Sequence, residues 1–170
     1  MYGYVQMIDS NSNSKYEEKI INIIKEALLF SGTDGIITVF NLIVGLTAAE
    51  IQRQTIFLVI LIAIIGDALS MALSFYNSNI EKLTDTTLLY IGCVANFGAF
   101  VILGGMVISF FMLFQQNSIM NAIISIIPSL LLLSLLQTEY TNRISTFVIG
   151  LSGSLFIYGI GRFSKNYIRV

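Results

Sequence analysis

The chain has 170 residues, of which 55% are hydrophobic and only 11% are charged, whereas an average soluble domain has about 25% charged residues. A soluble protein of this size could not bury so many apolar side chains without leaving large apolar patches exposed. The formal net charge is −1, with nine basic and ten acidic residues, which argues against a basic surface for nucleic acid. The composition therefore predicts an all-α, polytopic membrane protein.

Several kinds of chemistry are excluded by what the sequence lacks. The chain has one cysteine, Cys93, and no histidine, so one subunit can form neither an internal disulfide nor a metal site built from thiolates and imidazoles. No glycine-rich phosphate loop, H-E-x-x-H motif or nucleophile triad is present. We therefore expect neither an enzyme nor an ATP-driven pump, and no bound cofactor.

The N-terminal residues 1–18 are mostly polar, are of low complexity in their second half, and contain no apolar core of a signal peptide. They predict a disordered tail, which precedes a membrane domain over residues 19–170. The first residues of that domain, 19–26, read K-I-I-N-I-I-K-E and place isoleucines on one side and polar residues on the other. This pattern is typical of an amphipathic turn at the membrane surface.

Five later segments are long and apolar enough for membrane-spanning helices, each of which needs about 20 residues. They cover roughly residues 27–48, 55–76, 88–114, 118–137 and 144–163. Short connections predict that neighbouring helices run antiparallel, and an odd number of spans places the two termini on opposite sides of the membrane. Lysine and arginine divide five to four between the two sides, so they barely orient the chain.

Two aspartates lie within the apolar segments. Asp67 has largely apolar sequence for twelve residues before it and eight after it, so a helix cap cannot explain it, and its structural alternative is a hydrogen bond to a serine or a backbone carbonyl. Asp34, in S-G-T-D-G, is either a ligand within the first span or the N-cap of a helix that begins at Gly35. A charge buried in a spanning helix costs about 3 kcal/mol and usually faces a bundle interior or a water-filled path. We therefore predict that both aspartates bind a cation or a proton.

Met71 follows Asp67 by four residues, so the two side chains share a helix face. Carboxylate oxygens suit hard cations, and a thioether adds a preference for softer iron or copper. Asp34, Asp67 and Met71 are therefore the predicted metal ligands, while a structural role is favoured for Asn41, Asn96 and Met106. Because one subunit supplies few ligands, and because Gly66, Ser70 and Ser74 form a small-residue face on the second span, a homodimer with the path near its interface is expected.

Two stretches, K-E-A-L-L-F-S-G-T-D-G-I-I-T-V-F-N-L-I-V-G-L-T-A-A and I-I-G-D-A-L-S-M-A-L-S-F-Y, resemble the first two spans of the vacuolar iron transporter family. The C-terminal stretch F-V-I-G-L-S-G-S-L-F-I-Y-G-I-G-R is similar to the fifth span. The resemblance implies a five-span homodimer, with a cytosolic N-terminus, that moves ferrous iron, and often manganese, out of the cytosol in exchange for protons. It implies a vacuolar or other intracellular membrane, with the plasma membrane as the alternative. By position, Asp34 matches the family's pore acid and Met71 its pore methionine.

The chain also departs from the family pattern. Ala63 stands where some members carry a glutamate, and Asp67 stands where a glycine is usual, one helical turn nearer Met71 and on the same face. The cytosolic metal-binding insertion of the plant members is absent, because the second and third spans are joined by only about ten residues, 77–86. Two alternatives therefore stay open: a membrane protein of the same scaffold that does not transport, and a carrier for a different cargo.

Overall fold

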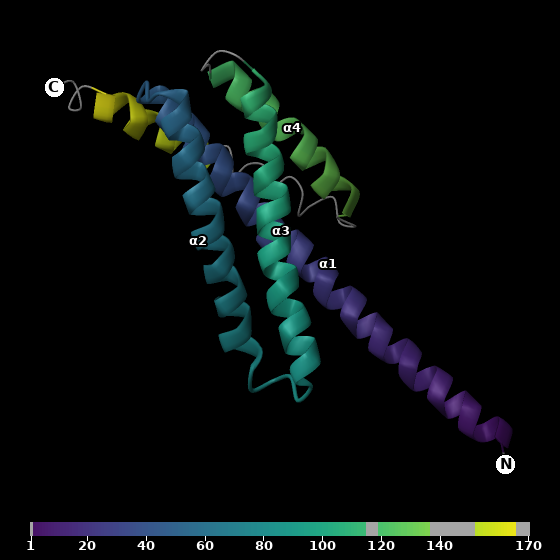
Figure 1. Ribbon diagram of the computed structural model, residues 1–170. Coiled ribbons are helices and arrows are strands. Elements are labelled where there is room, and N and C mark those ends of the chain that lie inside the picture. Colours follow the sequence, from purple (N-terminus) through teal and green to yellow (C-terminus); the bar gives the residue numbers. More distant parts are fainter. Residues whose placement is uncertain (1, 115–118, 137–151, 166–170) are drawn as a thin grey trace.

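The computed structural model describes residues 2–114, 119–136 and 152–165. Its helices are α1 (Tyr2–Ala48), α2 (Arg53–Asn79), α3 (Thr86–Leu113) and α4 (Ile119–Leu136), followed by a helix over residues 152–165, which we call the C-terminal helix. The described part of the chain contains no strand, which confirms the all-α prediction. Figure 1 shows α1, α2 and α3 as long neighbouring rods, with α2 running antiparallel to both others.

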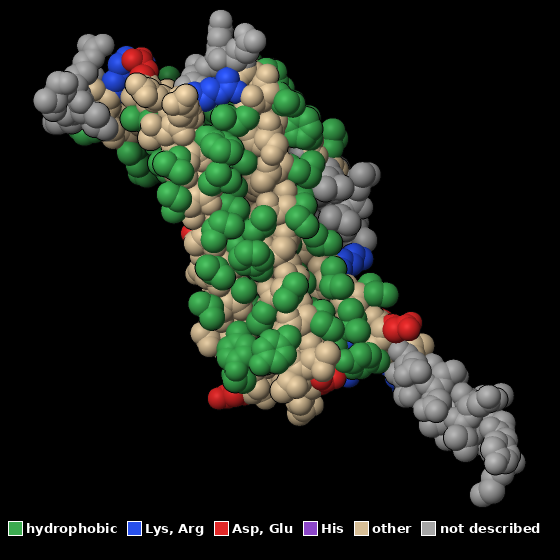
Figure 2. All heavy atoms as spheres, in the orientation of Figure 1, with side chains coloured by type: hydrophobic (Ala, Val, Ile, Leu, Met, Phe, Trp, Pro, Cys, Tyr) green, Lys and Arg blue, Asp and Glu red, His purple; other side chains and the backbone are tan. Residues whose placement is uncertain are grey.

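Within the described residues, three helical segments are long and apolar enough to cross a membrane: Ser14–Ala48, Arg53–Asn79 and Thr86–Leu113. They agree with the first three predicted spans. The predicted fourth and fifth spans fall partly outside the described residues, so five complete spans stay a prediction. Figure 2 shows apolar side chains over the middle of one face, with most charged side chains near its two ends, as expected for a protein surrounded by lipid.

The N-terminal segment differs from its sequence-based prediction. Where residues 1–18 were expected to form a disordered tail, α1 continues back to Tyr2 and projects beyond the other helices (Figure 1). No proline lies in this stretch, and no glycine lies between Gly3 and Gly32, so no residue that breaks helices ends α1 earlier. The amphipathic turn expected over residues 19–26 is likewise part of this single helix.

The contact between α1 and α3 is the most extensive in the bundle, and glycines make it close. A Cβ atom added at Gly35 would lie 2.8 Å from the backbone oxygen of Phe100, and one added at Gly104 would lie 3.2 Å from the backbone oxygen of Gly35. The two backbones can approach in this way only because these residues lack side chains. α1 and α3 therefore form the packed centre on which the other helices lie.

α2 buries only one stripe of its surface. Its buried residues follow a four-residue spacing: Ile56, Ile60, Ile64 and Ala68. Large apolar side chains on its other sides are exposed in the single chain, among them Leu58, Ile62, Leu69 and Leu73. A helix that is apolar on all sides but buried on one must be covered by lipid or by another protein surface.

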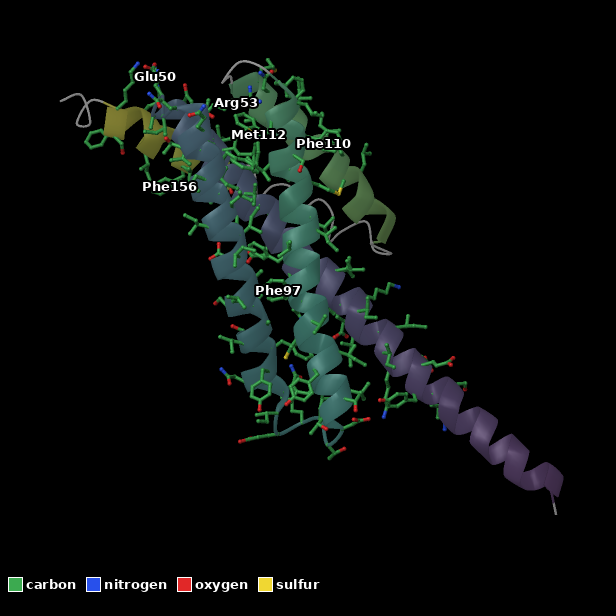
Figure 3. The ribbon with its side chains drawn as sticks, in the orientation of Figure 1. Glu50, Arg53, Phe97, Phe110, Met112 and Phe156 are labelled. Atoms are coloured by element: carbon green, nitrogen blue, oxygen red, sulfur yellow. The ribbon has the colours of Figure 1, made fainter. Side chains whose placement is uncertain are left out.

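Polar contacts hold the end of the bundle where α1 turns into α2. Glu50 has a φ of 60°, and the amide of Ile51 donates to the carbonyl oxygen of Leu46 at 3.0 Å, which closes α1 as a Schellman motif. Arg53 donates to the last carbonyl groups of α3, and its guanidinium lies 5.9 Å from the ring centre of Phe111. Figure 3 shows Glu50, Arg53 and Met112 together at this end. Since Glu50 also pairs with Lys165, the C-terminal helix is attached to the same end.

Candidate metal path

Asp34 lies within a continuous helix. α1 runs through this position from far upstream to Ala48, so the interpretation of Asp34 as the N-cap of a helix beginning at Gly35 is wrong. The hydroxyl of Thr38, one turn further along α1, lies near the Asp34 carboxylate. In the single chain the side chain is exposed, on a side of α1 away from the glycine contact with α3.

Asp67 lies in the middle of α2, directly before the fully buried Ala68. Ala63, Asp67 and Met71 are each half-buried and follow one another at four-residue spacing, which places them on one face of the helix. Met71 packs against the central apolar cluster. An acid at position 63 and an acid at position 67 would thus lie along the same line of the helix surface, one turn apart.

The fold brings the two aspartates near each other. Asp34 of α1 and Asp67 of α2 are close enough for their charges to interact, although 33 positions separate them in the sequence. Two like charges in an apolar environment repel, and a proton or a cation bound beside them removes that repulsion. Among the described residues no group of three or more histidine, cysteine or acidic side chains could hold a metal. The candidate ligands that one chain offers are therefore the two carboxylates and the neighbouring thioether of Met71.

The weaker candidates divide into two kinds. Asn96 is buried, accepts a hydrogen bond from the fully buried Ser31, and donates to the carbonyl of Gly92 at 2.8 Å. It therefore links α1 to α3 in the buried interior. Met106 packs partly buried against the core, which agrees with the favoured structural role.

Asn41, unlike Asn96, lines an open groove between α1 and the C-terminal helix. Its side-chain oxygen accepts a hydrogen bond of 2.6 Å from the hydroxyl of Ser154 on the C-terminal helix. Thr38 and Ser154 were not among the predicted site residues. Thr38 could have been found from its four-residue spacing after Asp34, but nothing in the sequence pairs Asn41 with a serine 113 residues away.

Residues 26–87 match the sequence profile of the VIT family. This stretch of the chain is similar to the VIT family. It begins before Asp34 and ends after Met71, so it contains all three predicted ligands, and the resemblance to the vacuolar iron transporters is confirmed over these residues. No curated protein and no solved structure matches the chain significantly.

The VIT family match over residues 26–87 fits the helical architecture. The family consists of membrane transporters of metals and not of enzymes, and the helices described above are those of an integral membrane protein. The two acids lie on α1 and α2, the two helices that the VIT match covers. The part of the chain with the family signature is therefore the part that carries acids within apolar helices.

Proposed function

We propose that this chain transports divalent metal cations, ferrous iron first and manganese second, across a membrane in exchange for protons. The observation that carries the proposal is the approach of Asp34 and Asp67 to each other in the middle of two long apolar helices. Charges are costly there and mark ion pathways in membrane proteins. The VIT match over the same helices supports a metal as the cargo.

The chemistry follows from the ligands. Each carboxylate can hold either a proton or a share of a divalent cation, so arrival of the metal releases protons and its departure restores them. Two carboxylates and one thioether make a weak, incomplete ligand set, and transport requires binding that is weak enough to release. The thioether of Met71 favours iron over harder cations of the same charge.

We further propose that the protein works as a homodimer. In the single chain Asp34 is exposed, and a carboxylate facing hydrocarbon costs about 3 kcal/mol, so water or a second copy must cover it. The outer side of α2 offers a surface on which a second copy could pack closely. Gly66 lies there without a side chain, and a Cβ atom added to it meets no atom of the same chain within 4 Å. A twofold axis beside α1 and α2 would enclose four aspartates around one path. Gly66→Leu should then weaken self-association measured by light scattering in detergent.

The direction and the location rest on the family resemblance alone. We propose transport out of the cytosol into a vacuole or another intracellular compartment, with the N-terminus cytosolic. The alternative locations and cargoes are outcomes of the same transport assay, because a cation series and an imposed pH gradient separate them.

The decisive experiment is metal uptake into vesicles that contain the purified protein. Asp34→Asn and Asp67→Asn should each abolish most uptake of Fe²⁺ or Mn²⁺, because each removes a charge while keeping the size of the side chain. Glu81→Gln is the matched control, since Glu81 is an exposed acid in the loop between α2 and α3. Uptake that is unchanged in both aspartate variants, or absent from the folded wild type, would refute transport and favour a non-transporting scaffold.

A further inference from the structure

A groove opens on one side of the crossing between α1 and α3. The two helices touch at Gly35 and Phe100 and separate towards the end of the bundle that carries the α2–α3 loop (Figure 1). Between the separating helices lies a groove of about 730 Å³. Ile24 and Leu28 of α1 form one wall, and α3 from Thr86 to Ile102 forms the other. The groove is thus the wedge of space that two crossing helices leave between them.

The length of the groove matches one leaflet of a bilayer. From Thr86 to Ile102, α3 rises about 24 Å at 1.5 Å per residue. Half of a bilayer is about 20–22 Å thick when its head groups are included. Since Ile102 lies near the middle of α3 (Thr86–Leu113), the groove runs from the head-group level to about the bilayer midplane. A spanning helix of a partner would need a groove across the whole hydrocarbon core, about 30 Å, whereas a lipid tail needs only one leaflet.

The polar side chains of the groove are at its outer end. Thr86 is exposed where α3 begins, and Tyr90 follows one turn later, at the level where tyrosine is enriched in membrane proteins. From Ile91 to Ile102, every residue that lines the groove is apolar or glycine. Tyr90, Val94 and Ile102 are each more than 60% exposed in the single chain. A ligand that fills the groove must therefore be polar at one end and apolar along the rest of its length.

Lys25 adds a positive charge at the outer end. It is next to Ile24 and three residues before Leu28, so it lies at the edge of the α1 face that lines the groove. Its side chain is exposed, and a lysine can lay its stem along apolar surface while the ammonium stays among head groups. The acids Glu26 and Asp85 line a separate polar cavity, and Glu26 points to nearly the opposite side of α1 from Ile24, because two residues turn a helix by about 200°.

We propose that this groove binds one acyl chain of an anionic phospholipid, whose phosphate is held by the ammonium of Lys25 and the hydroxyl of Thr86. Hydrogen bonds between an ammonium and a phosphate are charge-assisted and among the stronger ones in proteins. The chain covers apolar side chains of both walls and so holds α1 and α3 together on the open side of their crossing. The inference goes beyond the proposed transport function and does not depend on it.

The test measures binding of phosphatidylglycerol to the purified full chain in detergent. Native mass spectrometry counts the lipids that each molecule retains, and thermal unfolding gives the rise in Tm that the lipid causes. Gly98 lines the groove, and a Cβ atom added there meets nothing within 4 Å, so Gly98→Leu places a side chain in the space of the lipid tail. Gly98→Leu should weaken binding at least tenfold and remove the rise in Tm. Gly105→Leu is the matched control, because its Cβ position is equally open but lies outside the groove.

The head group is tested separately. Lys25→Gln should weaken the binding of phosphatidylglycerol severalfold and leave the binding of diacylglycerol, which has no phosphate, unchanged. Lys15→Gln is the control, since Lys15 is also an exposed lysine of α1 but lies about 15 Å further from the groove. Glycerol phosphate, which has the phosphate but no acyl chain, should not raise the Tm. An equal rise with glycerol phosphate would show a site for free phosphate and overturn the lipid assignment.

Two other results would overturn the inference. One is equal retention of phosphatidylglycerol by Gly98→Leu and Gly105→Leu. The other is a smaller oligomer of Gly98→Leu in light scattering with lipid retention unchanged, which would show that a second copy of the chain covers the groove. If Gly98→Leu does not fold, the wild type decides, with one phosphatidylglycerol per chain that carries a photoreactive group at the end of its tail. Crosslinks within residues 91–102 support the site, and crosslinks confined to α2 refute it.

Discussion

Gly35→Ala should destabilise the protein, because it places one methyl group where α1 touches α3. The new Cβ atom would lie 2.8 Å from the backbone oxygen of Phe100, whereas ordinary contact begins near 3.4 Å. The two backbones must therefore separate by about 0.6 Å, since neither atom belongs to a flexible side chain. Overpacking of this kind costs about 1–3 kcal/mol.

Gly105→Ala is the matched control, because a Cβ atom added there meets nothing within 4 Å. Both substitutions replace a helical glycine by alanine and gain the same helix propensity, about 1 kcal/mol. That gain cancels in the comparison, so Gly35→Ala should be less stable than Gly105→Ala by the overpacking cost alone. For a protein of this size the difference corresponds to a Tm lower by several degrees, at about 2–4 °C for each kcal/mol.

The assay is thermal unfolding in detergent, in which the readout is the amount of monodisperse protein that remains after heating. Because Gly35 is next to Asp34, the same displacement should also slow metal uptake in Gly35→Ala and leave Gly105→Ala unaffected. Equal Tm values for the two variants would show that α1 and α3 do not meet at Gly35, and would refute the packing on which the position of Asp34 depends.

Three further predictions concern the ends of the helices and the ligand set. Asp85 accepts the amide of Thr87 at 2.8 Å, which holds the pKa of the Asp85 carboxyl below its usual range. The stabilisation that this hydrogen bond gives is present above the unfolded pKa of about 4 and is lost as pH falls through the lower folded pKa. The Tm difference between the wild type and Asp85→Ala, measured at pH 7, should therefore shrink as the pH falls below about 4. Arg53→Ala should cost about 1–2 kcal/mol in thermal unfolding, and Arg53→Lys less, because Arg53 caps α3 over the Phe111 ring. Met71→Leu should keep the folded yield and lower the ratio of Fe²⁺ to Mn²⁺ uptake, and an unchanged ratio would remove Met71 from the ligand set.

Much of the membrane architecture could be predicted from the sequence, because an apolar run of about 20 residues matches the thickness of a bilayer when it forms a helix. The shared face of Ala63, Asp67 and Met71 also followed from helical periodicity alone. The contacts of Asn41 with Ser154 and of Ser31 with Asn96 could not be predicted, since they depend on how distant helices cross.

The ambiguity at Asp34 has a specific physical cause. S-G-T-D-G has low helix propensity, and for that reason the sequence alone allowed a helix that starts after Asp34. In the structure α1 continues, because Ser31, Gly32 and Gly35 are buried against α3. Tertiary packing therefore overrides the local preference of these residues.

The same packing explains why the acid is exposed on another side of α1. Gly32 and Gly35 use their lack of side chains to bring α1 onto α3, and Asp34, between them in sequence, points away from that contact and interacts with Asp67 of α2. A helix closely packed on one side and charged on another cannot rotate in the bilayer without separating the glycines from α3. The carboxylate is thereby held at a fixed place beside α2, as the proposed cation path requires, and the glycines of this stretch fix it there.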